Sequence, residues 1–441
     1  MTAEVAIMNK LAVALAADSA VTMELRGRRK IYDSINKLFA LSKFRPVGIM
    51  VYGNAEFMDV PWETIIKLYR ARLGIGAFQK LEDYVVDFIR FIESENSLFP
   101  NIKQEEYFRG AVSGYYAYNI REEIDTRVKN FLKDNTEIDD EQIKKIVETT
   151  IGKHLQELEK NKDLEAVSQD YIEHLIGGHE KIISEVIKEV FENLPISGES
   201  LNNLKKIPGL LFSKEIFLIS VSGVVIAGFG EAEFFPSLIR IQAEGIVDNK
   251  LKYGNKRESK IDLDNSARIS AFAQREMVVT FMEGIDPGVR NFIDSALEDI
   301  FIDKYPGMVV EDLQFKDSNE KENVVNKLKK VGKGIVDEFK RQTREYTKKY
   351  YSSPVTEAVT ALPKDELATM AETFVNLTSF KRKISTDTEE TVGGPIDVAV
   401  ISKGDGFVWI KRKHYFRADL NQQFFANYFR DSLAKGEEET L

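Results

Sequence analysis

The stretch 1-MTAEVAIMNKLAVALAADSAVT-22 decides how this chain is interpreted. Apolar and small residues dominate from its first positions, and only the polar pair Asn9-Lys10 interrupts them. A two-residue loop that starts with Asn suits a β-hairpin, so the pattern predicts two strands, over 3–8 and 11–17. Most chains begin with a few residues on which nothing depends, whereas this pattern predicts order from the start. The N-terminus is therefore a candidate functional group.

The predicted register of this hairpin brings polar residues to one end. If Met8 pairs with Leu11, Thr2 lies opposite Ala17 and Asp18 follows directly. A second hairpin is predicted from NKLFALS, a turn over 43–46 with Ser42 paired to Val47, and VGIMVYGN. Lys37 and Gly53 then lie at the same end of this second ladder. Both hairpins thus deliver polar residues to strand ends.

Composition limits the classes of function. The chain has 441 residues, of which 43% are hydrophobic and 30% charged, with a net charge of −10. An acidic chain does not suit general nucleic-acid binding, and no apolar run reaches the roughly 18 residues of a membrane helix. The chain has no cysteine, which excludes disulfides, thiolate metal sites and a cysteine nucleophile, and favours the cytoplasm. No secretory leader is expected, because Glu4 precedes any positive charge and the apolar run is short.

Strand-like and helical segments alternate in long blocks, which predicts an α+β layered architecture and not a doubly wound one. A helical, charged block lies between two strand-rich blocks, and the end of the chain reads as a disordered tail. The predicted ranges are 1–79 for the N-terminal half of a core, 80–206 for a helical insertion, 207–303 for the central part of the core, 304–362 for a second helical insertion, 363–432 for the C-terminal part of the core and 433–441 for the tail.

The polar residues at the strand ends suit an N-terminal nucleophile. The Thr2 hydroxyl can attack a carbonyl when a free α-amine, with a pKa of roughly 7.7–8.0, removes its proton. A neighbouring Lys37 would stabilise the alkoxide, and Asp18 would hold that lysine in place. The backbone N–H of Gly53 could bind the oxyanion. This chemistry requires removal of Met1, which is usual before a residue as small as threonine.

At this point the chain resembles proteasome β subunits and the bacterial HslV-type threonine peptidases. The resemblance rests on T2-A-E-V-A-I-M-N-K-L-A-V-A-L-A-A-D18, K37-L-F-A-L, G-I-M-V-Y-G53-N-A, V-V-I-A-G-F-G and T-V-G-G-P-I-D-V-A-V-I-S-K-G-D-G-F, in that order. It implies a four-layer αββα sandwich of the N-terminal-nucleophile hydrolase type. It also implies a homo-oligomer that cleaves peptide or protein substrates, with an ATP-dependent unfoldase as a possible partner.

Carried over residue by residue, the resemblance makes Thr2 the nucleophile, Asp18 and Lys37 the charge pair, and Gly53 the oxyanion donor. In the loop STDTEETVGG, the candidates for the family's supporting Asp and Ser are Asp387, Glu390 and Thr391, whose spacing departs from the family pattern.

Each of these residues can also have a purely structural role. Thr2 can be an incidental second residue, Asp18 a strand end, Lys37 an edge-strand charge and Gly53 a turn residue. Two other functions also stay open: an amidase for small molecules, and a scaffold without catalysis whose helical insertions bind a partner. No cofactor or metal site is predicted, since three of the four histidines, His154, His174 and His179, lie in the helical, charged block.

Overall fold

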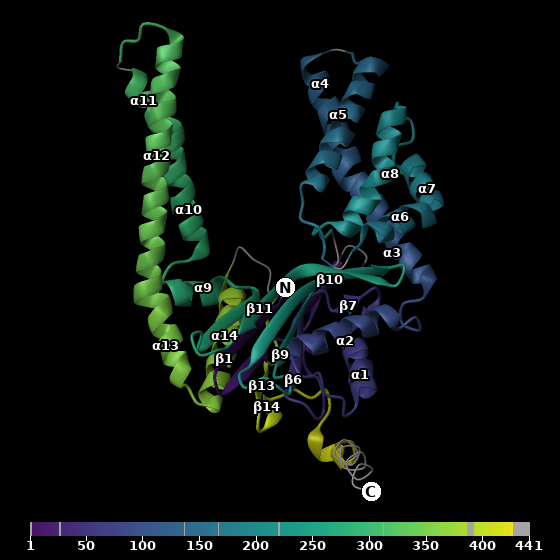
Figure 1. The fold of residues 1–441 in the computed structure, drawn as a ribbon, viewed down its shortest axis with the longest axis vertical. Helices are drawn as coiled ribbons and strands as arrows, with labels where there is room; N and C mark the ends of the chain where they lie inside the picture. The colour runs from purple at the N-terminus through teal and green to yellow at the C-terminus, as the bar shows by residue number, and fades with distance from the viewer. Residues whose placement is uncertain are drawn as a thin grey trace. The chain divides into compact units, whose positions relative to one another are not determined.

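The computed structural model describes residues 2–25, 28–135, 137–165, 167–218, 221–311, 313–385 and 392–426. The chain forms two compact units (Figure 1). Unit 1 comprises Met1–Leu38, Phe234–Pro236 and Lys260–Leu441, and unit 2 comprises Phe39–Glu233 and Ser237–Ser259. Each unit contains helices and an antiparallel sheet, so the fold is α+β. The four-layer sandwich and the linear domain ranges stay predictions, and the predicted tail lies outside the described residues.

Unit 1 is built on a five-stranded sheet in the order β12-β1-β2-β13-β14. Its strands are β1 (Ala3–Asn9), β2 (Ala12–Ala17), β12 (Ala267–Ala273), β13 (Asp397–Ser402) and β14 (Gly406–Lys411). One face carries alternate small and branched residues of β1 and β2, which pack with helix α14 (Lys364–Ile384). Because side chains alternate along a strand, the remaining residues of β1, Glu4 among them, point to the other face.

The first hairpin turns later than the sequence predicted. Val5 pairs with Ala16 and Met8 with Val13, so the register is shifted by two residues from the predicted pair of Met8 with Leu11. The reason is the side chain of Asn9, whose Oδ1 accepts hydrogen bonds from the backbone N–H groups of Leu11 (2.9 Å) and Ala12 (3.3 Å). Asn9 is therefore the residue before the loop and not its first member.

The remaining elements of unit 1 are mostly helical. A two-stranded ribbon, β3 (Val21–Leu25) with β4 (Arg28–Tyr32), forms where the sequence suggested only a polar stretch. The helices are α9 (Glu276–Glu283), α10 (Pro287–Glu298), η2 (Asp299–Lys304), α11 (Tyr305–Glu311), α12 (Ser318–Thr347), η3 (Lys348–Ser352), α13 (Ser353–Ala361) and η4 (Ala418–Leu420).

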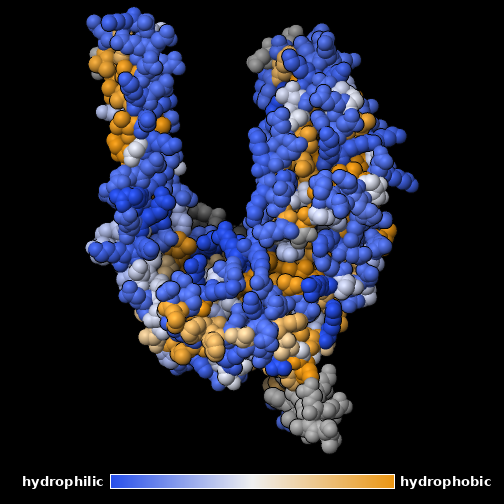
Figure 2. Space-filling view, in the orientation of Figure 1, coloured by the Kyte–Doolittle hydropathy of each residue, from blue (hydrophilic) through white to orange (hydrophobic). Residues whose placement is uncertain are grey.

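Helix α12 carries more apolar surface than unit 1 covers. Gly332 and Val336 are buried, whereas Val331, Ile335 and Phe339 are 59%, 50% and 45% exposed. Figure 2 shows apolar side chains along the column that α11 and α12 form. Among the described residues, no helix combines the length and the apolar character that a membrane span requires.

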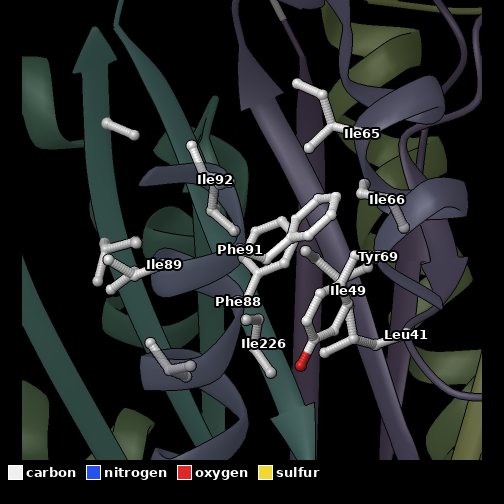
Figure 3. Packing of buried hydrophobic residues seen from close by; sticks show 14 of the residues in the cluster. Leu41, Ile49, Ile65, Ile66, Tyr69, Phe88, Ile89, Phe91, Ile92 and Ile226 are labelled. Atoms are coloured by element: carbon white, nitrogen blue, oxygen red, sulfur yellow. The ribbon is translucent and has the colours of Figure 1, made fainter. Parts of the chain in front are cut away.

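Unit 2 contains a second five-stranded antiparallel sheet, in the order β11-β10-β9-β6-β5. Its strands are β5 (Leu38–Ala40), β6 (Val47–Gly53), β9 (Ser222–Gly228), β10 (Ser237–Val247) and β11 (Lys250–Lys260). Helices α1 (Trp62–Leu73) and α2 (Leu81–Ser94) pack against it through Tyr69, Phe88 and Phe91, which meet Ile49 and Ile226 of the sheet (Figure 3). A short ribbon of β7 (Glu56–Phe57) and β8 (Val60–Pro61) precedes α1.

The second predicted hairpin also differs in detail. The N–H of Leu41 donates to the carbonyl of Val47 (3.0 Å), in place of the predicted pairing of Ser42 with Val47. The Ser42 hydroxyl instead accepts hydrogen bonds from the backbone N–H groups of Phe44 and Arg45, both at 3.1 Å. Like Asn9, Ser42 stabilises the turn with its side chain and so changes where pairing begins.

A second hydrophobic core in unit 2 lies among the helices between residues 101 and 213. These helices are α3 (Asn101–Gly114), η1 (Tyr115–Arg121), α4 (Glu122–Asp134), α5 (Asp140–Glu159), α6 (Gln169–Gly178), α7 (Glu180–Val190) and α8 (Gly198–Ser213). Three of them begin at a side-chain cap, Asp139, Ser168 or Ser197, which accepts a hydrogen bond from a backbone N–H of the first turn.

Candidate functional site

The Lys37 ammonium is the centre of the candidate site in unit 1. Its Nζ donates hydrogen bonds to Oδ1 of Asp18 (2.6 Å), to Oγ1 of Thr2 (3.1 Å) and to the carbonyl of Ala20 (2.5 Å). Thr2, Asp18 and Lys37 are 3%, 0% and 5% exposed, so the three polar groups satisfy one another away from solvent. The structure therefore brings together three of the residues predicted from the sequence.

Asp18 is held from several directions. Besides Lys37, its Oδ1 accepts a hydrogen bond from the N–H of Ala3 (3.1 Å), and its Oδ2 accepts from the N–H groups of Ala20 (3.3 Å) and Gly393 (3.1 Å). Its own N–H donates to the carbonyl of Ala3 (3.1 Å), which extends the β1–β2 ladder by one pair. A carboxylate with so many donors stays in one orientation, and so does the ammonium that it binds.

Two other segments join next to this carboxylate. The N–H of Ser19 donates to the carbonyl of Gly393 (3.1 Å), and the N–H of Ile35 donates to the carbonyl of Ser19 (3.2 Å). The Ser19 hydroxyl also donates to the carbonyl of Pro395. Gly394 has a φ of +74°, and a Cβ there would lie 2.7 Å from the carbonyl oxygen of Asp33. Only glycine allows the chain to pass this closely.

Further ionisable groups, which sequence reasoning missed, lie beside the three residues. Glu4 is fully buried, and burial raises the pKa of its carboxyl well above the usual value, while Lys37 lowers it and Asp18 raises it. Asp397, in β13, is 2% exposed and accepts hydrogen bonds from the side chain and the N–H of Lys413. Burial lowers the pKa of Lys413, whereas Asp397 raises it. A signal existed in the sequence, since Glu4 and Asp397 are single charges within apolar strands.

The other predicted site residues are placed less fully. Gly53 ends β6 in unit 2, with a φ of +86°, and a Cβ there would lie 2.5 Å from the carbonyl oxygen of Val221. Its glycine identity is thus explained by the backbone, and its role as an oxyanion donor stays a prediction. Asp387 and Thr391, with Glu390, lie outside the described residues. Within the described ranges, no group of three or more His, Asp or Glu side chains is arranged to hold a metal ion.

The arrangement has a definite chemical capacity. An ammonium that donates to a threonine hydroxyl lowers the free energy of the corresponding alkoxide, because it places positive charge where negative charge develops. A base must still take the hydroxyl proton, and Lys37, as a donor to three oxygens, does not serve as that base. A free α-amine on Thr2 would supply it.

Comparisons with known proteins do not support the family assignment. No protein-family model matches the chain, and no curated protein does. A solved structure described as the Anbu (Gly-1) mutant from Hyphomicrobium sp. strain MC1 aligns over 99% of this chain and 97% of that chain, with 9% identity and a TM-score of 0.27. A similarity this low carries no argument about fold or function.

The assignment to the proteasome β-subunit and HslV-type family, suggested by the sequence, is therefore wrong as an identification. The blocks behind it are an apolar hairpin, one lysine and several glycine turns. Such short segments follow from the general requirements of antiparallel sheets and do not specify a family.

Proposed function

We propose that this protein is an amide hydrolase that uses Thr2 as an N-terminal nucleophile once Met1 has been removed. The observation that carries the proposal is the 3.1 Å hydrogen bond from the Lys37 ammonium to the Thr2 hydroxyl, with Asp18 fixing the ammonium at 2.6 Å. A buried lysine–aspartate pair is also found for purely structural reasons. The further contact of the Lys37 ammonium, to the Thr2 hydroxyl, favours catalysis.

In the proposed reaction, the Thr2 oxygen attacks the amide carbonyl carbon while the α-amine of Thr2 takes the hydroxyl proton. Lys37 stabilises the negative charge that develops on the Thr2 oxygen as its proton leaves. The protonated amine then donates its proton to the leaving nitrogen, the carbon–nitrogen bond breaks, and an ester to Thr2 remains. Water, activated by the same amine, hydrolyses this ester and restores the free hydroxyl.

Peptide amides are the substrate class that we propose first. Assembly into a homo-oligomer, an ATP-dependent unfoldase partner and a cytoplasmic location stay predictions from the sequence. An amidase for small molecules and a scaffold without catalysis are the outcomes against which the proposal is tested.

The test is hydrolysis of a panel of fluorogenic peptides, unfolded proteins and small amides by the full chain and its variants. Thr2→Ala should lower the rate roughly 10³-fold or more, and Lys37→Met roughly 10²-fold or more, whereas Thr2→Ser should retain activity. Thr373→Ala and Lys411→Met, at exposed or half-exposed positions of the same unit, are the matched controls.

The distribution of activity over the panel separates the alternatives. Cleavage of small amides alone, dependent on Thr2, would indicate an amidase. Equal rates for the Thr2→Ala variant and the unaltered protein on every substrate would reject Thr2 as the nucleophile. Absence of hydrolysis, with an unchanged cellular role for Thr2→Ala, would favour the scaffold.

A further inference from the structure

Glu4 is a buried carboxyl group with no hydrogen-bond partner among the residues that the structure describes. It is 0% exposed, and neither of its side-chain oxygens makes a hydrogen bond with any other residue that the structure describes. A carboxylate in such a place is costly, because it loses its hydration and gains nothing in return. Glu4 therefore needs an explanation that packing alone does not supply.

The sheet register places Glu4 beside the candidate nucleophile. Thr2 directly precedes β1, and its carbonyl accepts a hydrogen bond from the N–H of Gln274 (3.0 Å), so the extended chain continues through it. Because side chains alternate along an extended chain, Thr2 and Glu4 point to the same side. The nucleophile and this carboxyl are thus next neighbours along one face.

The same register places Glu4 in a row across four strands. Glu4 is opposite Phe272 of β12 on one side and Ala17 of β2 on the other, and Ala17 is opposite Asp397 of β13. Directly opposite residues lie about 4.5–5.5 Å apart between Cβ atoms. The small side chain of Ala17 leaves room between the carboxyl groups of Glu4 and Asp397.

The side-chain charges around Glu4 already form two ion pairs that do not include it. Asp18 follows β2 and pairs with Lys37, which precedes β5, while Asp397 of β13 pairs with Lys413, which follows β14. These four groups carry two positive and two negative charges, and from β12 the residue opposite Glu4 is the uncharged Phe272. An ionised Glu4 would add a third negative charge to a buried cluster.

We propose that Glu4 is a positioning residue: as a neutral carboxylic acid it leaves the Lys37–Thr2 hydrogen bond undisturbed, and on ionisation it inactivates Thr2. The proposal rests on the proposed function. An anionic Glu4 would compete with Thr2 for the Lys37 ammonium and oppose the negative charge that develops on the nucleophile. It would also hold the Thr2 α-amine in its protonated form, in which that amine is no base.

The direction of the pH dependence follows from the burial of Glu4. Burial raises the pKa of its carboxyl above the usual value, with Lys37 lowering it and Asp18 raising it. The folded state therefore binds this proton more tightly than the unfolded state does. The contribution of the protonated Glu4 to the free energy of unfolding is complete below the ordinary glutamate pKa, and it is lost as the pH rises through the pKa in the folded state. Activity should fall over that rise, by about tenfold for each pH unit above the folded-state pKa.

The first arm of the experiment measures stability and does not require activity. Urea unfolding of the full chain is compared from pH 5 to pH 9 for the unaltered protein, Glu4→Gln and Glu4→Met. The free energy of unfolding of the unaltered protein should fall as the pH rises, and in both variants this fall should be absent. At pH 8 both variants should therefore be more stable than the unaltered protein. Glu244→Gln is the matched control, because Glu244 is also buried but is paired with Lys252 at 2.5 Å. That variant should be less stable at every pH.

The second arm measures the rate at which a β-lactone labels Thr2 over the same pH range. The unaltered protein should show a bell-shaped profile, and Glu4→Gln and Glu4→Met should extend labelling to higher pH. Identical profiles for all three proteins would overturn the role of Glu4 in reactivity. If the free energy of unfolding depends on pH in both variants as it does in the unaltered protein, the claim that Glu4 is a neutral acid in the folded state would be overturned. If Thr2 reacts in none of them, the proposed function fails, and the stability arm still decides the state of Glu4.

Discussion

A single ammonium group connects the structural and chemical roles of this site. Lys37 is 5% exposed and donates to Thr2, Asp18 and Ala20. Burial of a charge costs several kcal/mol, and excellent geometry is needed to recover it. Here the ammonium pairs with Asp18 at 2.6 Å, and its bond to Thr2 at 3.1 Å is a contact beyond that pair.

Asp18→Asn tests how much the Asp18–Lys37 pair contributes to stability and how much it contributes to the reactivity of Thr2. The substitution removes the negative charge but keeps the shape, so Lys37 is left without its counter-ion. The free energy of unfolding should fall by roughly 3–5 kcal/mol, because breaking one partner of a buried pair leaves an uncompensated charge. Urea denaturation measures this loss, and β-lactone labelling of Thr2 measures reactivity on the fraction that is folded.

Asp286→Asn is the control for that substitution, because Asp286 also pairs with a lysine, Lys381 at 3.2 Å, but at a more exposed position. Its effect should stay within about 1 kcal/mol. Equal small effects for both variants would show that the Asp18–Lys37 pair contributes nothing that a surface pair does not.

Among the elements, the β1–β2 hairpin has the most direct influence on the site, since its register sets where Thr2 and Asp18 lie. Asn9 fixes that register through the turn. Its Nδ2 also donates to the carbonyls of Val359 (3.0 Å) and Leu362 (2.9 Å), at the end of α13. One side chain thus satisfies a turn and a helix end.

Asn9→Ala should therefore destabilise the protein by roughly 2–4 kcal/mol, since it removes the hydrogen bonds of the turn together with those to the carbonyls of Val359 and Leu362. Urea denaturation gives the size of the loss. Leu11→Ala, at a position 53% exposed in the same turn, should change stability by less than about 0.5 kcal/mol. A stability loss for Leu11→Ala as large as for Asn9→Ala would contradict the role assigned to Asn9.

Helices α4 and α5 are joined by an ion pair between Glu123 and Lys153. Burial raises the pKa of Glu123 on α4, but hydrogen bonds from Lys153 and Arg127 outweigh it and lower the pKa to about 2. A carboxyl with a lowered pKa stabilises the folded state above its ordinary pKa and loses that effect as the pH falls through the folded-state value. The difference in unfolding midpoint between the unaltered protein and Glu123→Gln should therefore shrink from pH 5 to pH 2. A constant difference over this range would contradict the assignment.

Across the whole molecule, the sequence predicted the ends of strands better than their pairing. Thr2, Asp18 and Lys37 were found because polar residues next to apolar runs mark strand ends, and because the predicted hairpins and the family resemblance assigned roles to residues there. The registers were wrong because the side chains of Asn9 and Ser42 stabilise the turns, and residue type alone does not show this. Glu4, Asp397 and Lys413 were missed because their proximity depends on pairing between strands far apart in the sequence.

The proposed role of Thr2 as a reactive N-terminal nucleophile can be examined by intact mass spectrometry of the purified protein with and without a β-lactone. The expected result is a mass that corresponds to a chain beginning at Thr2, and one lactone adduct that is lost in Thr2→Ala. A mass that retains Met1, together with no adduct on Thr2, would contradict it.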